Sequence, residues 1–188
     1  MAAGDVDPLE LALRLAGQLE QRAIPYAIGG ALAYGLWAIP RATADVDLNV
    51  FVEGPGLAAV YDALEAGGVP VDRARASSAA SREGMFEAWT GPIRVDVFVP
   101  SIDFSREAEA RRVRREVAGV AAWFLSAEAL AVFKLLFFRP KDVADLERLV
   151  ALRRGRLDLD YVRGWLVRLM GEDDERVKRW DELARAAG

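Results

Sequence analysis

The sequence predicts an α+β fold in which helices flank a β-sheet and a helical section follows. Three observations favour it. Short apolar runs with polar residues between them, at Tyr26 to Ile28, Asp45 to Val52 and 85–99, indicate strands. Apolar residues at helical spacing lie between these runs. Only helical patterns follow residue 125, so we expect a core over residues 1–125 and a helical section over residues 126–188.

Composition limits the chemistry that this chain can use. Its 188 residues are 53% hydrophobic, which is enough to bury the core of one domain, alone or with a helical appendage. It contains no cysteine and no histidine. Thiolate nucleophiles, Ser-His-Asp triads and histidine metal sites are therefore excluded, which leaves carboxylate–metal chemistry as the catalytic route. The net charge of −4 argues against a protein that coats nucleic acid with its whole surface.

The first segment predicts a helix and no targeting signal. Asp7 at the N-cap, Pro8 at the first helical position and Glu10 at the third are typical of a helix start. Met1 to Asp7 carries acids and no basic region, so we expect no secretory signal and a cytoplasmic protein. The longest apolar region, Val117 to Phe138, contains charged residues and predicts a buried strand followed by a helix, not a membrane span.

A glycine pair and two acids are concentrated in the stretch from Ile24 to Val52. The first strand ends in Gly29-Gly30, and the apolar segment Ala31 to Ile39 predicts a buried helix. Asp45 and Asp47 then open a strand, so they point to the same face with Cα atoms about 6.5 to 7 Å apart. Such a pair suits one or two divalent cations, which prefer carboxylate oxygen.

A third carboxylate is predicted beside this pair. The runs Met85 to Thr90 and Ile93 to Val99 flank Gly91-Pro92 and predict a β-hairpin whose second strand carries Asp96. A carboxylate among valines is destabilising unless it is paired, hydrogen-bonded or bound to metal. We therefore expect Asp96 to lie beside the first two acids and to complete their site.

Other segments between the predicted strands have a mainly structural interpretation. Leu57 to Leu64 predicts an amphipathic helix closed by Gly67-Gly68, and Val69 to Glu83 predicts an irregular excursion. A helix is expected between Ser105 and Val117. It carries the strongest basic cluster, Arg106, Arg111, Arg112, Arg114 and Arg115. Interleaved glutamates favour a solvated, ion-paired face over one that binds phosphate.

The next two predicted helices carry a lysine and two acids. Ser126 caps a helix that runs to Phe138, in which Lys134 is the only cation. Pro140 starts the next helix, where Asp142 lies within about 50° of the centre of the apolar stripe and Asp145 about 110° away. Asp142 is therefore the predicted partner of Lys134. The alternative is that Asp142 only complements the positive end of its own helix.

The order of these residues resembles a known superfamily. Gly-Gly, then R-x-T-x-D-x-D from Arg41 to Asp47, then a separate strand with Asp96, is similar to the nucleotidyltransferases that include the polymerase β-like enzymes. The resemblance implies a mixed sheet flanked by helices. It also implies that Asp45, Asp47 and Asp96 bind Mg²⁺ or Mn²⁺, and that the glycine turn, Gly29 and Gly30, holds the triphosphate of an NTP.

The later motifs refine this resemblance. S-x-E-x-L-x-x-x-K-L from Ser126, followed by R-P-K-D-x-x-D-L from Arg139, is similar to the AbiEii/AbiGii-type nucleotidyltransferases, which include toxins of toxin–antitoxin and phage-resistance systems. The match covers about residues 24–150. It implies that Lys134 contacts the nucleotide and that Asp142 or Asp145 forms a late acidic motif. Arg41 would contact phosphate or pair with an acid, and Thr43 would contact the nucleotide or only support the turn.

The resemblance implies an enzyme that moves a nucleoside monophosphate from NTP to an acceptor hydroxyl and releases pyrophosphate. Three functional classes stay open. One is a toxin-type enzyme that acts on RNA or protein and has a cognate antitoxin. The second is a small-molecule nucleotidyltransferase of the antibiotic-modifying kind, and the third is an inactive relative that acts as a binding partner. None of them requires a membrane.

Overall fold

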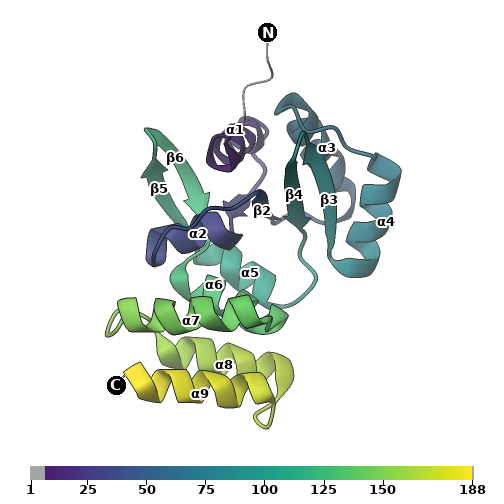
Figure 1. Ribbon diagram of the computed structural model, residues 1–188. Coiled ribbons are helices and arrows are strands. Elements are labelled where there is room, and N and C mark those ends of the chain that lie inside the picture. The colour runs from purple at the N-terminus through teal and green to yellow at the C-terminus, as the bar shows by residue number, and fades with distance from the viewer. Residues whose placement is uncertain (1–6, 188) are drawn as a thin grey trace.

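The computed structural model describes residues 7–187 and has a six-stranded mixed sheet flanked by helices (Figure 1). The strand order is β3-β4-β2-β1-β6-β5. The bounds are β1 (Tyr26–Ile28), β2 (Asp45–Val50), β3 (Met85–Thr90), β4 (Ile93–Phe98), β5 (Val113–Val117) and β6 (Val120–Phe124). β2 runs parallel to β4 and β1 parallel to β6, while the other neighbouring pairs are antiparallel. The predicted fold class is confirmed. Residues 1–6, on which the prediction of no secretory signal rests, lie outside the described residues.

The helices begin where the sequence supplies caps. The side chains of Asp7, Ser126 and Asp158 each accept a hydrogen bond from a backbone N–H of the first turn that follows. The bounds are α1 (Pro8–Gln21), α2 (Gly30–Trp37), α3 (Leu57–Ala66), α4 (Arg73–Glu83), α5 (Phe104–Ala110), α6 (Ala127–Phe137), α7 (Pro140–Leu152), α8 (Leu159–Met170) and α9 (Glu175–Ala187), with a 3-10 turn at Gly54–Gly56. No described helix has the length and apolar character needed to cross a membrane.

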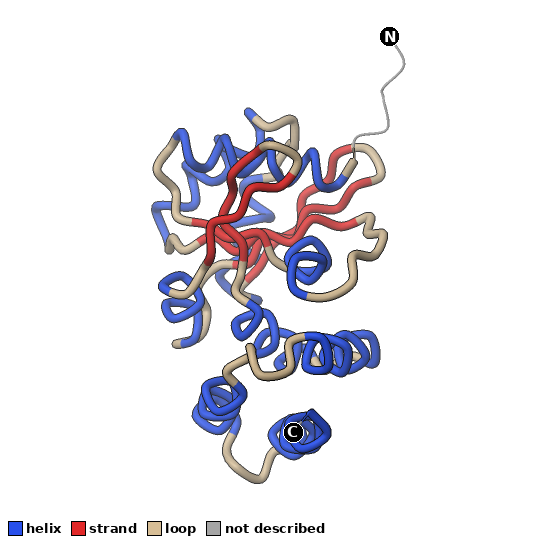
Figure 2. Tube along the Cα trace, turned by 90° about the vertical axis from the view of Figure 1, so that its left-hand side faces the viewer, coloured by secondary structure: helices blue, strands red, loops and turns tan. Residues whose placement is uncertain are grey.

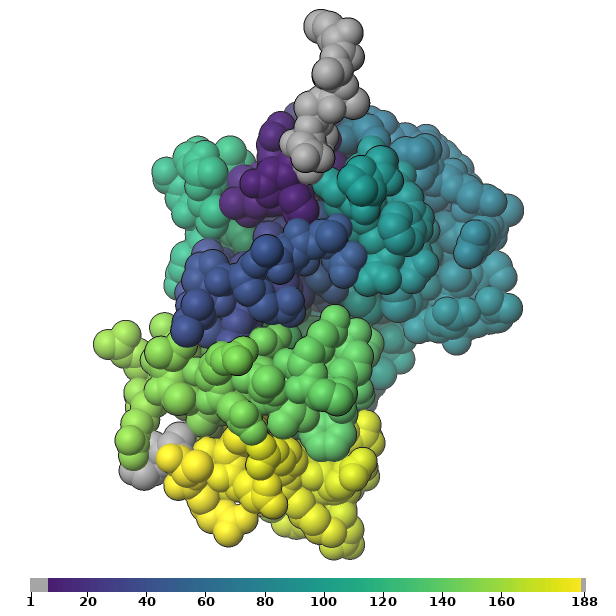
Figure 3. Space-filling model, viewed as in Figure 1, coloured from purple at the N-terminus to yellow at the C-terminus, as the bar shows by residue number. Residues whose placement is uncertain are grey.

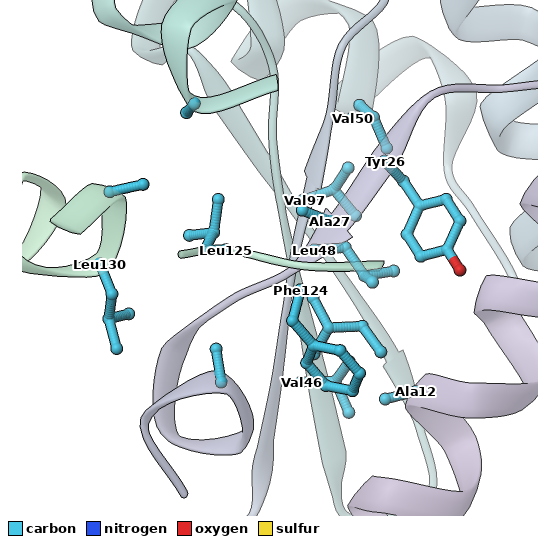
Figure 4. Close-up of a cluster of buried hydrophobic side chains, with 14 of the residues drawn as sticks. Ala12, Tyr26, Ala27, Val46, Leu48, Val50, Val97, Phe124, Leu125 and Leu130 are labelled. Atoms are coloured by element: carbon cyan, nitrogen blue, oxygen red, sulfur yellow. The ribbon is translucent and has the colours of Figure 1, made fainter. Parts of the chain in front are cut away.

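The sheet separates an apolar face from a polar face. On the apolar face, Val46, Leu48 and Phe124 are buried beneath α1, and Figure 4 shows Ala12 of α1 on that side with Leu125 and Leu130 on the other. Helices α7, α8 and α9 lie in a separate stack beyond α6, away from the strands (Figures 2 and 3). The polar face of β2 and β4 therefore opens toward α2, α6 and the start of α7.

The segment from Val69 to Glu83, predicted to be irregular, contains helix α4. Its only buried side chains are Ala76 and Ala80, so it lacks the broad apolar stripe by which a helix is recognised from sequence. Asp72 caps its first turn, and Gly84 ends it in a left-handed conformation with a φ of 70°. The prediction was wrong because small residues can pack a helix closely without a hydrophobic pattern.

The prediction of a helix between Ser105 and Val117 was also wrong for the second half of that segment. Helix α5 ends at Ala110, and Val113–Val117 forms the edge strand β5. Ala118 and Gly119 adopt φ values of 50° and 78°, which allows a tight hairpin turn into β6. The basic cluster is largely ion-paired, as predicted, through Arg111 with Glu107, Arg112 with Glu109 and Arg114 with Glu20.

Candidate functional site

The polar face of β2 and β4 carries three rows of paired side chains. Because the strands are parallel neighbours in register, Asp45 lies opposite Arg94, Asp47 opposite Asp96, and Asn49 opposite Phe98. Residues two apart on a strand share a face, so all three rows face the same side. The predicted position of Asp96 beside Asp45 and Asp47 is confirmed.

Arg94, which the sequence analysis did not single out, stands between two of the acids. Its Nη2 donates a hydrogen bond to Oδ2 of Asp45 at 3.1 Å. Its Nε lies 3.0 Å from Oδ1 of Asp96, but the two groups are not aligned for a hydrogen bond, and both atoms are buried without another partner. Asp96 therefore has a buried oxygen whose hydrogen-bonding capacity is unused.

The pKa values of the two central carboxylates, Asp47 and Asp96, are both raised. Burial raises the pKa of Asp47, the charge of Asp45 raises it further, and the nearby Lys134 opposes this. Burial also raises the pKa of Asp96, to about 6, with Arg94 opposing and Asp47 adding to the rise. Within the described chain Asp47 forms no ion pair. Both groups would be stabilised in their charged form by a cation placed between them.

The glycine turn is fitted closely to Asp47. The N–H of Gly29 donates to the backbone oxygen of Asp47 at 2.8 Å, which fixes β2 against the start of α2. Gly30 has a φ of +53°, and a Cβ on this residue would lie 1.7 Å from Oδ2 of Asp47. Gly30 is therefore required both by its conformation and by the space that the carboxylate occupies. The N-terminus of α2, where N–H groups favour anions, lies at the same place.

Lys134 lies in a buried ionic network at the start of α7. Its Nζ is 2.7 Å from Oδ2 of Asp145 and 3.4 Å from Oδ1 of Asp142. Asp142 is a partner, as predicted, but Asp145 is the nearer one, and both acids are buried. The prediction that Asp142 is the more buried acid followed from the apolar stripe of α7 alone. Lys134 of α6 and Arg41 after α2 cover the side of α7 that carries Asp145.

Arg139, which was not predicted as a site residue, joins this network together with the predicted Arg41, while the predicted Thr43 lies outside it. Arg139 donates from Nε to Oδ2 of Asp142 at 2.6 Å, and Asp142 accepts from the Arg139 backbone N–H in return. Arg41 donates to Oδ2 of Asp145 at 3.4 Å, so it pairs with an acid. Thr43 accepts a hydrogen bond from the N–H of Asp45 at 3.2 Å and supports the turn before β2.

Some of these groups, among them Asp47 and Asp142, line a small cavity of about 50 Å³. Phosphate-compatible groups line one side of it, namely Gly30, Lys134 and Arg139, and Asp47 lies with them. The other side is formed by Asn49, Phe98 and aromatic residues of α6. The cavity therefore lies between Asp47 and the cationic residues Lys134 of α6 and Arg139 before α7.

The carboxylates fit a divalent cation only in part. No three acidic side chains among residues 7–187 are gathered closely enough to hold a metal ion by themselves. Asp47 and Asp96 are nevertheless adjacent oxygen donors, Asp47 half-buried and Asp96 buried, and Asp96 has an oxygen with no hydrogen-bond partner. Mg²⁺ usually takes one or two carboxylates and completes its shell with water and phosphate oxygens. Asp45 would join them by exchanging its contact with Arg94 for the ion.

Comparison with known proteins identifies the fold. The sequence matches no protein-family model and no curated protein. The structure is similar to that of the antibiotic-resistance factor ANT(2'')-Ia in solution, with a TM-score of 0.56 and 17% identity over 96% of this chain and 92% of that one. It is also similar to ANT(2'')-Ia in complex with adenylyl-2''-tobramycin, with a TM-score of 0.52 and 16% identity over 95% of this chain and 98% of the other.

A fungal protein shares the same architecture. An antigenic nucleotidyltransferase-like protein from Paracoccidioides brasiliensis is similar with a TM-score of 0.52 and 18% identity, over 92% of this chain and 93% of that one. The chain therefore has a nucleotidyltransferase-like fold. At these identities the likeness establishes the fold alone, and the chemistry must be argued from the site.

Proposed function

We propose that this chain is an Mg²⁺- or Mn²⁺-dependent nucleotidyltransferase that transfers a nucleoside monophosphate from NTP to an acceptor hydroxyl. One observation carries the proposal. Asp96 is a buried carboxylate, Asp47 is a half-buried one beside it on the sheet, and Asp47 fills the space that a side chain on Gly30 would need. Acids that need a cation thus lie at a glycine turn where phosphate oxygens can approach the backbone.

The chain's own residues can perform the transfer as follows. Bound divalent cations would neutralise charge on the phosphates and on the attacking and leaving oxygens. Asp96, which lies beside Asp47 on the neighbouring strand, can take the acceptor proton as the general base. The acceptor oxygen then bonds to the α-phosphorus, while the bond from that phosphorus to the oxygen of the β-phosphate breaks. Pyrophosphate leaves.

The triphosphate would lie between the glycine turn and the cationic end of α6 and α7. Lys134 and Arg139 line the cavity beside Gly30, and Lys141 is near enough to lower the pKa of Asp47. Asp142 and Asp145 would hold Lys134 in place, leaving it to offer its charge to the triphosphate over a short distance.

For the acceptor, a small molecule is the first class to test. The structure of ANT(2'')-Ia that resembles this chain holds adenylyl-2''-tobramycin. A toxin-type enzyme that acts on RNA or protein, with a cognate antitoxin, is the other active class, and the motifs after Ser126 favour it. An inactive binding partner would keep the fold and lose binding of metal and NTP.

The decisive experiment is transfer of label from each α-labelled NTP. Purified protein is incubated with Mg²⁺ and with separate pools of small hydroxylated metabolites, RNA and protein. We expect label in one pool with the parent and none with Asp47→Asn or Asp96→Asn. Equal transfer by the parent and by Asp47→Asn would contradict the proposal. Absence of NTP binding would favour the inactive class.

A further inference from the structure

A second and larger cavity continues from the first along the same two strands. It has a volume of about 280 Å³. It shares Asn49, Phe98, Phe133 and Phe137 with the smaller cavity, so the two lie side by side. Its floor is the third row of the polar face, Asn49 and Phe98, extended by Met85, which lies opposite Phe98 on β3.

The lining of this second cavity differs in chemistry from that of the first. It contains no lysine or arginine and a single carboxylate, Glu83, which is paired with Arg82 at 3.0 Å. Three of the four residues that it shares with the smaller cavity are aromatic. Phe98 and Phe137 pack edge to face with ring centroids 5.8 Å apart, and the Phe137 side chain is 48% exposed. The Arg139 guanidinium lies over this ring, 4.8 Å from its centroid, and the exposed part of the ring is a surface on which a planar group can stack.

The spacing of the rows connects the two cavities. Successive rows on one face of a strand lie about 6.5 to 7 Å apart. A phosphate held at the row of Asp47 and Asp96 would therefore have its attached sugar over the next row. The group beyond that sugar would enter the apolar cavity, while the distal phosphates remain beside Gly30, Lys134 and Arg139.

We propose that the 280 Å³ cavity binds the nucleobase of the NTP, with Phe137 and Phe98 as the stacking residues. This inference rests on the proposed function and adds the site that determines base binding. A base suits the cavity because it is planar and uncharged. Phosphate would lack a cation there, and a polycationic acceptor would find one already paired carboxylate. The buried Asn49 amide and Ser105 hydroxyl can offer hydrogen bonds to the edge of a base.

The test separates base binding from phosphate binding. Calorimetric titrations with Mg²⁺ would compare each of the four NTPs with inorganic tripolyphosphate, using the parent and Phe137→Ala. Because stacking on an aromatic ring contributes substantially to the binding of each base, we expect Phe137→Ala to weaken NTP binding about tenfold. Tripolyphosphate binding should weaken clearly less than NTP binding, since Phe137→Ala removes only the ring under the Arg139 guanidinium and keeps its charge. Phe137→Tyr should bind NTP like the parent.

Two further variants control for indirect effects. Leu152→Ala removes a side chain that is 53% exposed on α7 and lines neither cavity, and it should leave both affinities unchanged. Ser101→Trp places a ring into the cavity from its exposed rim, and it should abolish NTP binding while tripolyphosphate still binds.

Each other outcome overturns the inference in a recognisable way. Unchanged NTP affinity in Phe137→Ala and Ser101→Trp, with tripolyphosphate bound normally, would leave the proposed function standing and place the base elsewhere. If NTP and tripolyphosphate affinities fell together, Phe137 would act on the phosphates. A parent that binds neither compound would overturn the proposed function as well.

Discussion

At the scale of single residues, Gly30 is the position in the site that tolerates a side chain least. We expect Gly30→Ala to lower the free energy of unfolding by about 1 to 3 kcal/mol, because the backbone is left-handed there. The new Cβ would also displace the Asp47 carboxylate, so binding of Mg²⁺ and NTP should be lost. Chemical unfolding and calorimetric titration measure the two effects.

Gly17 provides the matched control for this substitution. It lies within α1 with nothing near its missing Cβ. Gly17→Ala should therefore stabilise the protein by about 0.5 to 1 kcal/mol through helix propensity and leave NTP binding intact. Normal binding of NTP by Gly30→Ala would show that Asp47 is not held where the site needs it.

Lys134 is the residue whose removal the core should tolerate least. It is buried between Asp142 and Asp145, so Lys134→Met would leave two buried acids without their shared cation. We expect the free energy of unfolding to fall by about 3 to 5 kcal/mol, as for a broken buried ion pair. Lys141→Met, at the exposed second residue of α7, should change it by less than about 0.5 kcal/mol. A stable Lys134→Met that fails to bind NTP would assign Lys134 to the nucleotide alone.

The same network predicts how stability depends on pH. Burial of Asp142 opposes its charge, but hydrogen bonding to Arg139 and the charge of Lys134 outweigh this and hold its pKa below the ordinary 3.8. A lowered pKa contributes stability above the ordinary pKa, and this contribution is lost as pH falls through the folded value. Asp142→Asn should therefore destabilise the protein by about 1 to 3 kcal/mol at pH 6 and by less at pH 3. An equal loss at both pH values would contradict this, as judged by urea unfolding.

At the scale of elements, the strands that carry the site could be predicted from sequence and the segments at the edge of the sheet could not. Polar and apolar residues alternate over Asp45–Asn49 and Arg94–Val97, so the common face of Asp45 and Asp47 followed from periodicity, and the position of Asp96 beside them followed once β2 and β4 were paired. Arg94 could have been found by the same rule, since it precedes Asp96 by two residues. β5 is exposed and rich in arginine, so its composition gave no sign of a strand. The contact of Lys134 with Asp145 depends on how α6 meets α7, which no single-element pattern contains.

The packing of the last helix gives a prediction at this scale. Trp180 of α9 is fully buried, and its Nε1 donates to the backbone oxygen of Leu159 at 3.1 Å. Trp180→Ala should lower the free energy of unfolding by about 3 to 5 kcal/mol, and Trp180→Phe by clearly less. Because neither cavity is lined by α8 or α9, the folded fraction should bind NTP with unchanged affinity. Loss of NTP affinity in both variants would mean that these helices shape the site.

At the scale of the whole molecule, α6 connects the two predicted sections. It lines both cavities, and its buried side chains belong to the same core as the sheet. The division at residue 125 remains a prediction, but this packing argues that residues 126–188 do not unfold independently. We expect one cooperative transition in urea, seen equally by far-ultraviolet circular dichroism and by tryptophan fluorescence. Two separate transitions would support independent sections.

The ligand dependence of the melting temperature tests the site and the fold together. Repulsion between Asp45, Asp47 and Asp96 is relieved in part by Arg94, and Asp47 forms no ion pair within the described chain. A ligand that binds only the folded state stabilises it by mass action, by about 2.7 kcal/mol at a free concentration 100 times its Kd. Mg²⁺ or Mn²⁺ with NTP should therefore raise the melting temperature of the parent.

Asp47→Asn should abolish this rise. It should leave the metal-free protein as stable as the parent or more so, because it removes a charge that burial disfavours. Asp62→Asn, at an exposed position on α3 away from both cavities, should shift like the parent. If Asp47→Asn responded to metal and NTP as strongly as the parent, the metal would bind elsewhere.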